Sequence, residues 1–386
     1  MPRSTGSLLV SSLALTAAIL CQPDSARAQG CIAVRGGSCM MGNHHMSETD
    51  AGSYLNAGEW QTSVAYRWLH SDREFKGNQE TATQDRYKNQ DVNDSHFIDL
   101  NALYAINARF SIGLTIPFVS STRSSKGEHG YSAAGDPGPY SYDKKRYSTS
   151  AGGIGDVRVA GYAWLWDPKK MPQGNLSVGL GLKLPTGDDA VTDVFHTSTA
   201  ATKVGPVDQS IQPGDGGYGF TVELQGFRNL YKGLSGYAQG YYLFNPRDMN
   251  GVSTLRGSTP TPFTPPETKV MSVTDQYLAR VGLSYNLVPQ WGLSLSFGPR
   301  IEGVPVEDLI GDSNGFRRPG YAISVEPGLS VNKGHWSFNV TAPVAFYRTR
   351  EQSLPEQQIS ARTGFYNQGN ASFADYVITS SISYRF

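Results

Sequence analysis

One short segment near the start of the chain combines residue types that could bind a metal ion. It runs from Cys39 to Met46 and offers a thiol, the imidazoles of His44 and His45, and the thioether of Met46. Such ligands suit copper or zinc, but ligand types alone do not fix a coordination geometry. The alternative is a segment whose His and Met residues are incidental. We predict no metal site and no cofactor, and keep His44, His45 and Met46 as the residues to test.

A second segment, Ser313-Asn314-Gly315, resembles part of the His-x-Ser-Asn-Gly nucleophile motif of outer-membrane phospholipase A, which is itself a β-barrel. Gly311 stands where that motif has its histidine, and a serine hydroxyl without an adjacent base is a weak nucleophile. Nucleotide-binding G-x-x-x-x-G-K and zinc-binding H-E-x-x-H motifs are absent from the sequence. We therefore predict that the protein is not an enzyme.

The elements that would carry these residues follow an alternating pattern. From Leu176 to Leu184 every second residue is Leu or Val, and Ser177, Gly179, Gly181 and Lys183 stand between them. Period-two alternation indicates a β-strand with one apolar and one polar face. About twelve such segments lie between Trp60 and Phe386, and most are long enough to cross a bilayer as tilted strands. A water-soluble β-sandwich or barrel is the alternative.

Connections between these segments alternate between short turns and long loops. Short ones lie near residues 107–108, 167–174, 229–233, 286–290 and 332–334, and long ones span about residues 71–93, 120–152, 188–216, 245–272, 304–319 and 350–370. Outer-membrane barrels have short periplasmic turns and long extracellular loops. The pattern predicts an all-β chain in which residues 58–386 form a transmembrane antiparallel β-barrel of about 12 strands.

An apolar exterior would leave the polar faces of the strands around an enclosed lumen. Buried charges of both signs could brace the wall by pairing, or line a pore that selects solutes. The predicted lumen-lining residues are Asp99, Asn101, Asp156, Arg158, Lys183, Glu223, Gln225, Arg280, Arg300, Glu302, Glu326, Asn339 and Arg385.

The N-terminal residues have the pattern of a secretory signal peptide. A basic Arg3 precedes an apolar stretch, and Ala26-Arg27-Ala28 offers a small-residue cleavage site, so we predict residues 1–28 to be removed after Ala28. Residues 29–57 would then form a periplasmic segment that could plug the barrel. In an oxidising compartment Cys31 and Cys39 are predicted to form a disulfide. The near-neutral charge, with 33 basic and 33 acidic residues, suggests no nucleic-acid partner.

Aromatic residues support placement in a membrane. Trp60, Trp164, Trp166, Trp291 and Trp336 fall beside the predicted periplasmic strand ends, where such side chains belong at the membrane–water boundary. The final segment alternates up to Phe386 and resembles the last strand of a bacterial outer-membrane barrel. That resemblance implies that the barrel-assembly machinery recognises Phe386 and that the protein lies in the outer-membrane lipid of a Gram-negative cell.

Two further stretches carry a family resemblance: Gly152-Gly153-Ile154-Gly155-Asp156-Val157, and the run from Gly179 to Asp188 that ends Lys183-Leu184-Pro185-Thr186-Gly187-Asp188. Together they resemble the outer-membrane family named after the meta-pathway of phenol degradation, whose members are often labelled transporters. The resemblance covers about residues 152–188. It implies a channel for passive diffusion of small molecules, aromatic or hydrophobic ones among them. The alternative is a closed structural or surface-binding barrel that acts through its long loops.

Overall fold

A computed structural model describes residues 54–81, 90–126, 145–196, 201–255 and 268–386. The predicted signal peptide, the Cys31–Cys39 disulfide and the candidate ligands His44, His45 and Met46 all lie outside these residues. Among the helices in the described ranges, none has the length and apolarity needed to cross a membrane.

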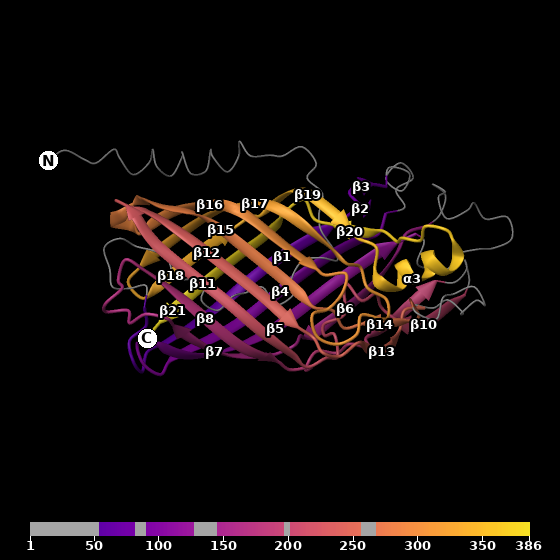
Figure 1. The fold of residues 1–386 in the computed structure, drawn as a ribbon, viewed down its shortest axis with the longest axis horizontal. Helices are drawn as coiled ribbons and strands as arrows, with labels where there is room; N and C mark the ends of the chain where they lie inside the picture. The colour runs from indigo at the N-terminus through magenta and orange to yellow at the C-terminus, as the bar shows by residue number, and fades with distance from the viewer. Residues whose placement is uncertain (1–53, 82–89, 127–144, 197–200, 256–267) are drawn as a thin grey trace.

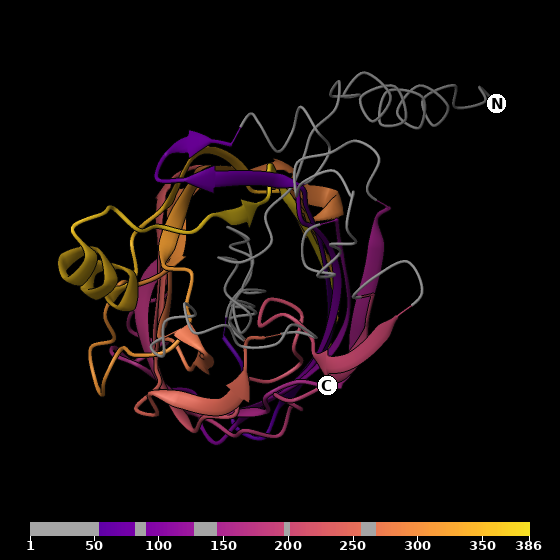
Figure 2. The same ribbon diagram turned by 90° about the vertical axis from the view of Figure 1, so that its right-hand side faces the viewer.

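Within the described residues, twelve antiparallel strands form a closed ring (Figures 1 and 2), as the alternation predicted. In chain order they are β1 (Trp60–Ser71), β4 (Val92–Ala105), β5 (Phe110–Ser125), β7 (Arg158–Trp164), β8 (Gly174–Lys183), β11 (Gly219–Tyr231), β12 (Leu234–Phe244), β15 (Gln276–Val288), β16 (Leu293–Val304), β17 (Gly320–Lys333), β18 (Trp336–Thr341) and β21 (Val377–Arg385).

Each of these strands pairs with its chain neighbour, and β1 pairs with β21 to close the ring. At this seam Gln61 lies opposite Arg385 and Leu69 lies opposite Val377. The backbone groups of Trp60 and Phe386 exchange two hydrogen bonds, of 2.8 and 3.0 Å, beyond the last ladder pair. Because the ring is closed, each barrel strand has a hydrogen-bonded partner on both sides, and this ring of described strands has no free edge strand.

The two ends of the barrel differ. At one end, which we call the short-turn end, strands are joined by tight connections such as the 3₁₀ helix η3 (Pro289–Trp291), and the C-terminus lies there (Figure 1). The other, long-loop end carries α3 (Leu354–Thr363) and the small strands β2 (Arg73–Lys76), β3 (Gln79–Glu80), β9 (Thr192–His196), β10 (Thr202–Pro206), β13 (Met249–Ser253), β14 (Val270–Ser272) and β20 (Ala371–Phe373).

The barrel wall is interrupted along two strand paths. Strand β6 (Tyr147–Ile154) pairs with β5 and precedes β7, and Gly155-Asp156-Val157 separates the two. Likewise β19 (Val344–Arg350) continues β18 along β17 after Ala342-Pro343. Proline removes a ladder donor, which accounts for the second interruption. Because β5 extends to Ser125 and β6 begins at Tyr147, this hairpin is longer than the sequence pattern indicated.

The exterior of the ring is apolar and the interior polar. On β8, Leu180 is 65% exposed, whereas Ser177 is 1% and Lys183 is 6% exposed. Four of the tryptophans named above are exposed on the outside, namely Trp60, Trp166, Trp291 and Trp336. Trp164 differs from the predicted boundary placement: it is 6% exposed and its ring packs inside the barrel. Side chains alternate along a strand, and Trp164 shares the inward face of β7 with Arg158, Ala160 and Tyr162.

Candidate lumen site

Most of the predicted lumen-lining residues lie on the inner side of the ring with side chains that are buried or nearly so, whereas Asn339 and Arg385 are half-buried. Asp99, Asn101, Arg158, Lys183, Glu223, Gln225, Glu302 and Glu326 are each at most 8% exposed. The side chains of Asp156, Arg280 and Arg300 are 12%, 17% and 10% exposed. The structure therefore gathers these residues from seven barrel strands and the β6–β7 connection into one enclosed interior.

On one side of the interior, β15, β16 and β17 carry a braced charge network. Arg300 contacts Glu302 at 3.0 Å and Glu326 at 2.9 Å, and Glu326 also binds Arg280. Arg280 and Arg300 are cross-strand neighbours, so Glu326 lies between two positive charges that would otherwise repel. Of the two roles that the sequence allowed for buried charges, bracing the wall fits this network best, because each of these charges has a partner.

The opposite wall is formed around the interruption between β6 and β7. The Thr186 hydroxyl donates to the Gly155 carbonyl at 2.8 Å and accepts from the Val157 amide at 2.9 Å. Asp156 accepts from the amides of Gly187 and Asp215, at 3.1 and 3.2 Å. The Gly/Asp and Pro-Thr-Gly stretches that carry the family resemblance thus meet here and hold the chain together where the ladder stops.

A loop segment folds inward from this wall. Residues 207–217, which we call the inward segment, follow β10, and the ring of strands surrounds them in the view from the long-loop end (Figure 2). Val207, Asp208, Ile211 and Gln212 are all at most 2% exposed. The sequence did not predict this arrangement, because Pro213-Gly214-Asp215-Gly216-Gly217 has the composition of an exposed turn.

Ion pairs anchor the inward segment at both ends. Arg318, from the connection between β16 and β17, donates two hydrogen bonds to Asp208, at 2.9 and 2.8 Å. At the other end Lys183 binds Asp215 and lies 3.6 Å from Asp156. Between them, Gln209 donates to the Ser272 carbonyl at 2.5 Å. The bidentate pair of Arg318 with Asp208 fixes the geometry of the segment as well as adding binding energy.

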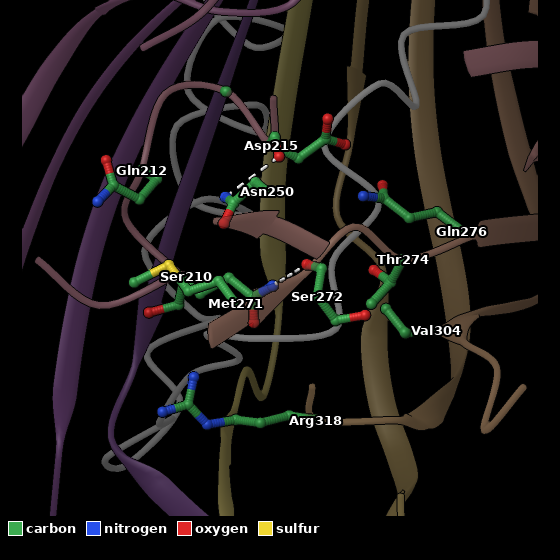
Figure 3. Close-up of a pocket in the computed structure, with 12 residues that line it drawn as sticks. Ser210, Gln212, Asp215, Asn250, Met271, Ser272, Thr274, Gln276, Val304 and Arg318 are labelled. Carbon is green, nitrogen blue, oxygen red and sulfur yellow. Dashed lines mark hydrogen bonds between the residues drawn. The ribbon is translucent and has the colours of Figure 1, made fainter. Parts of the chain in front are cut away.

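Two adjoining pockets lie along the inward segment. The outer pocket is lined mostly by polar residues (Figure 3), among them Gln212, Asp215, Asn250, Thr274, Gln276 and Arg318. The inner pocket has a largely apolar lining from Phe97, Pro117, Val119, Pro213, Tyr241 and Leu243, with Asp99, Asp156, Arg158 and Lys183 among its charged residues. Asp215 and Gln276 line both pockets, so the pockets adjoin at these two residues.

The short-turn end of the interior is filled by an aromatic cluster. Tyr54, which precedes β1, lies 5.0 Å from Trp164 and 5.9 Å from Phe227 between ring centroids, and its hydroxyl donates to the Met171 carbonyl at 3.0 Å. Leu55, Leu103 and Tyr162 complete the cluster with Ala105 and Ala160. Tyr54 and Leu55, which precede β1, therefore pack inside the barrel.

Just outside this cluster, Glu59 accepts hydrogen bonds from the backbone and side-chain amides of Asn56, at 2.8 and 2.7 Å. Partial burial raises the pKa of Glu59, but these bonds and the nearby charges of Arg385 and His335 outweigh it, so the pKa lies below its usual value.

Of the residues considered for an enzyme or metal site, Ser313 lies within the described residues, and His44, His45 and Met46 lie outside them. Ser313 is 5% exposed and its hydroxyl accepts the Asp308 amide at 2.8 Å, an arrangement that holds a turn. Across the described ranges, no group of three or more His, Cys, Asp or Glu residues is arranged to hold a metal ion.

Comparisons with known proteins identify the fold. No family model and no curated protein matches the chain. The structure is similar to that of the COG4313 outer membrane channel from Pseudomonas putida F1, with a TM-score of 0.52 and 12% identity over 88% of this chain and 100% of that chain.

Two less similar structures also match. One is the translocator domain of the autotransporter NalP from Neisseria meningitidis, with a TM-score of 0.44 and 14% identity over 86% of this chain and 90% of that chain. The other is the P. putida toluene transporter TodX, with a TM-score of 0.37 and 8% identity over the same shares. At such scores neither carries an argument, and the resemblance to the phenol-degradation family stays a prediction. What the comparisons establish is the fold: the chain is a twelve-stranded β-barrel of the outer-membrane type.

Proposed function

We propose that this protein is a passive outer-membrane channel for small molecules. The observation that carries the proposal is an enclosed interior with two adjoining pockets, inside a ring whose exterior is apolar. An apolar exterior suits hydrocarbon, and a polar interior suits water and solute. The short-turn end would face the periplasm and the long-loop end the outside, with Phe386 presented to the assembly machinery.

The finer part of the proposal concerns the solute. Side chains such as Phe97, Tyr241 and Leu243 give the inner pocket apolar surfaces, which favour solutes with an aromatic or aliphatic part. The polar outer pocket would receive the solute first. The inward segment would set the size limit, because Pro213 and Asp215 project into the path between the pockets.

The test is conductance of the purified protein in a planar bilayer, with solute flux into proteoliposomes measured in parallel. A channel should give discrete current steps and size-limited flux. Deletion of residues 209–214, closed with a Gly-Ser link, should raise both by widening the path, provided that the variant still migrates as a folded barrel before heating. Sealed vesicles and no current from either form would refute the proposal.

A second candidate is a closed barrel that binds a partner through its loops. Phe365 and Tyr366, directly after α3, are 80% and 67% exposed, and Leu309 on a neighbouring loop is 67% exposed. Large exposed apolar side chains are typical of interaction sites when they cluster. This candidate predicts that replacing Phe365 and Tyr366 by Ser abolishes partner binding, while neither wild type nor the deletion variant passes solute.

A further inference from the structure

The inner pocket contains a carboxylate for which the barrel supplies no direct partner. Asp99 on β4 lines this pocket and is 5% exposed, and within the described residues its side chain makes no hydrogen bond and no ion pair. Among the described residues, the charges of Arg67 and Arg158 act on it at longer range. A nearly buried carboxylate without a hydrogen bond from the protein is costly unless the pocket that it lines supplies a partner.

The other acids around the pocket differ from Asp99 in this respect. Asp156 accepts two backbone amides, and Asp215 accepts the Gly217 amide at 2.9 Å and binds Lys183. Glu223, behind the pocket wall, lies 3.4 Å from Arg158. Both cations of the pocket lining, Arg158 and Lys183, therefore already have an acid beside them, whereas no cation of the described residues contacts Asp99.

The register of the sheet explains why Asp99 lacks a partner. Its cross-strand neighbours are Ala65 on β1 and Pro117 on β5, and neither side chain can donate a hydrogen bond. Beside it on the same strand face, the Phe97 ring stacks under the Arg67 guanidinium, 4.4 Å from the ring centroid. The carboxylate is thus left at an apolar wall.

The pocket combines this acid with a matching apolar surface. Phe97, Pro117 and Val119 lie on the Asp99 side, and Tyr241 and Leu243 come from β12. Its volume is about 60 Å³, so an occupant must be small. Among the described residues around it, four carboxyl groups (Asp99, Asp156, Asp215, Glu223) outnumber three cations (Arg67, Arg158, Lys183).

We propose that the inner pocket is a binding site for small organic cations, in which an ammonium group donates to Asp99 and a short apolar chain lies against Phe97 and Tyr241. This proposal narrows the solute class of the channel proposed above. Binding at the site does not depend on the channel function, but a role of the site in transport rests on it. A small anion would have to displace acids from Arg158 or Lys183 and would lie near Asp99. A neutral alcohol would gain the apolar contacts but would leave the charge of Asp99 uncompensated.

Binding can be measured without transport. The purified full chain in detergent micelles is titrated with n-butylamine, 1-butanol and butyrate, which differ in charge but little in size, by ligand-observed NMR. Butylammonium should bind more tightly than the other two. Asp99→Asn should weaken its binding about tenfold or more, since a charge-assisted hydrogen bond is lost. Glu307→Gln, the same charge change at an exposed loop position, should bind like wild type.

Asp99→Glu keeps the charge and separates a charge effect from a folding defect, and it should retain preferential binding of the amine. Equal binding of amine and alcohol by wild type, or unchanged amine binding by a folded Asp99→Asn variant, would overturn the proposal.

A planar bilayer then links the site to transport. Butylammonium should interrupt the current of wild type more often than that of Asp99→Asn. If wild type binds the amine but carries no current, the channel function fails and the binding site stands. If it carries current but shows no preference for the amine, the site fails and the channel function stands.

Discussion

The ring of Tyr54 meets the indole of Trp164 edge-on, with centroids 5.0 Å apart and planes at 76°, inside the short-turn end of the barrel. Trp164 belongs to the wall, whereas Tyr54 lies on the chain that leads into β1. The contact therefore joins the segment before β1 to strand β7 of the barrel wall.

We expect Tyr54→Ala to loosen this end of the lumen and to raise single-channel conductance. Each aromatic pair lost costs about 0.5–1.5 kcal/mol beyond its buried area, and Tyr54 forms two such pairs. Tyr54→Phe is the matched control, since it keeps the ring and loses only the bond to the Met171 carbonyl. Equal conductance for the Ala and Phe variants would mean that the cluster does not limit the path.

The exterior of β8 tests whether the barrel spans a membrane. Leu180 and Leu309 are 65% and 67% exposed, but only Leu180 lies on the barrel wall. Leu180→Arg should cost about 2–4 kcal/mol if that position faces the bilayer midplane. Leu309→Arg, on a loop, should change stability by about 0.5 kcal/mol or less. Denaturant unfolding in lipid vesicles measures both, and equal stabilities would contradict a lipid-facing Leu180.

Two glycines of the resemblance segment test the packing of the inward segment. A Cβ at Gly187 would lie 2.7 Å from the Cα of Gly214, whereas a Cβ at Gly161 would meet nothing within 4 Å. Gly187→Ala should therefore destabilise by about 1–3 kcal/mol and shift the inward segment. Gly161→Ala should remain close to wild type. Heat-modifiable gel migration gives the stabilities, and a conductance change confined to Gly187→Ala would tie this contact to the path.

Acid should weaken the turn at Asn56–Glu59. Because the pKa of Glu59 is lowered in the folded protein, its ionised form is favoured there, and the resulting stability is present above the unfolded value of 4.5. That stability is lost as the pH falls through the lowered pKa. Glu59→Gln should thus melt slightly below wild type at neutral pH and match it in stronger acid. A constant difference across that range would mean that the charge of Glu59 plays no part.

Much of the barrel could be predicted because the signal repeats. Alternation assigns Leu180 and Lys183 to opposite faces with no knowledge of the neighbouring strand, and the polar interior follows from the same rule. Trp164 follows the same rule. Val159 and Leu165 are exposed on the outer face, and counting by twos from either one puts Trp164 inside.

The inward segment could not be predicted by such counting. Burial of Asp208 depends on Arg318, 110 positions along the chain, and burial of Asp215 depends on Lys183. A polar, glycine-rich loop has the same local composition whether it is solvated or held inside a barrel. Asp99 likewise has no hydrogen-bond donor opposite it because Ala65 and Pro117 are its cross-strand neighbours, and the strand register determines those neighbours.

The seam between β1 and β21 constrains how this molecule can be made. Its two halves come from opposite extremes of the described chain, so the ring stays an open sheet with two bare margins until the final strand arrives. Pairing over so long a separation in sequence is slow, and bare margins invite association with other chains. Biogenesis should therefore depend on a factor that shields β1 while translocation finishes, and chains lacking β21 should be cleared rather than persist as smaller rings.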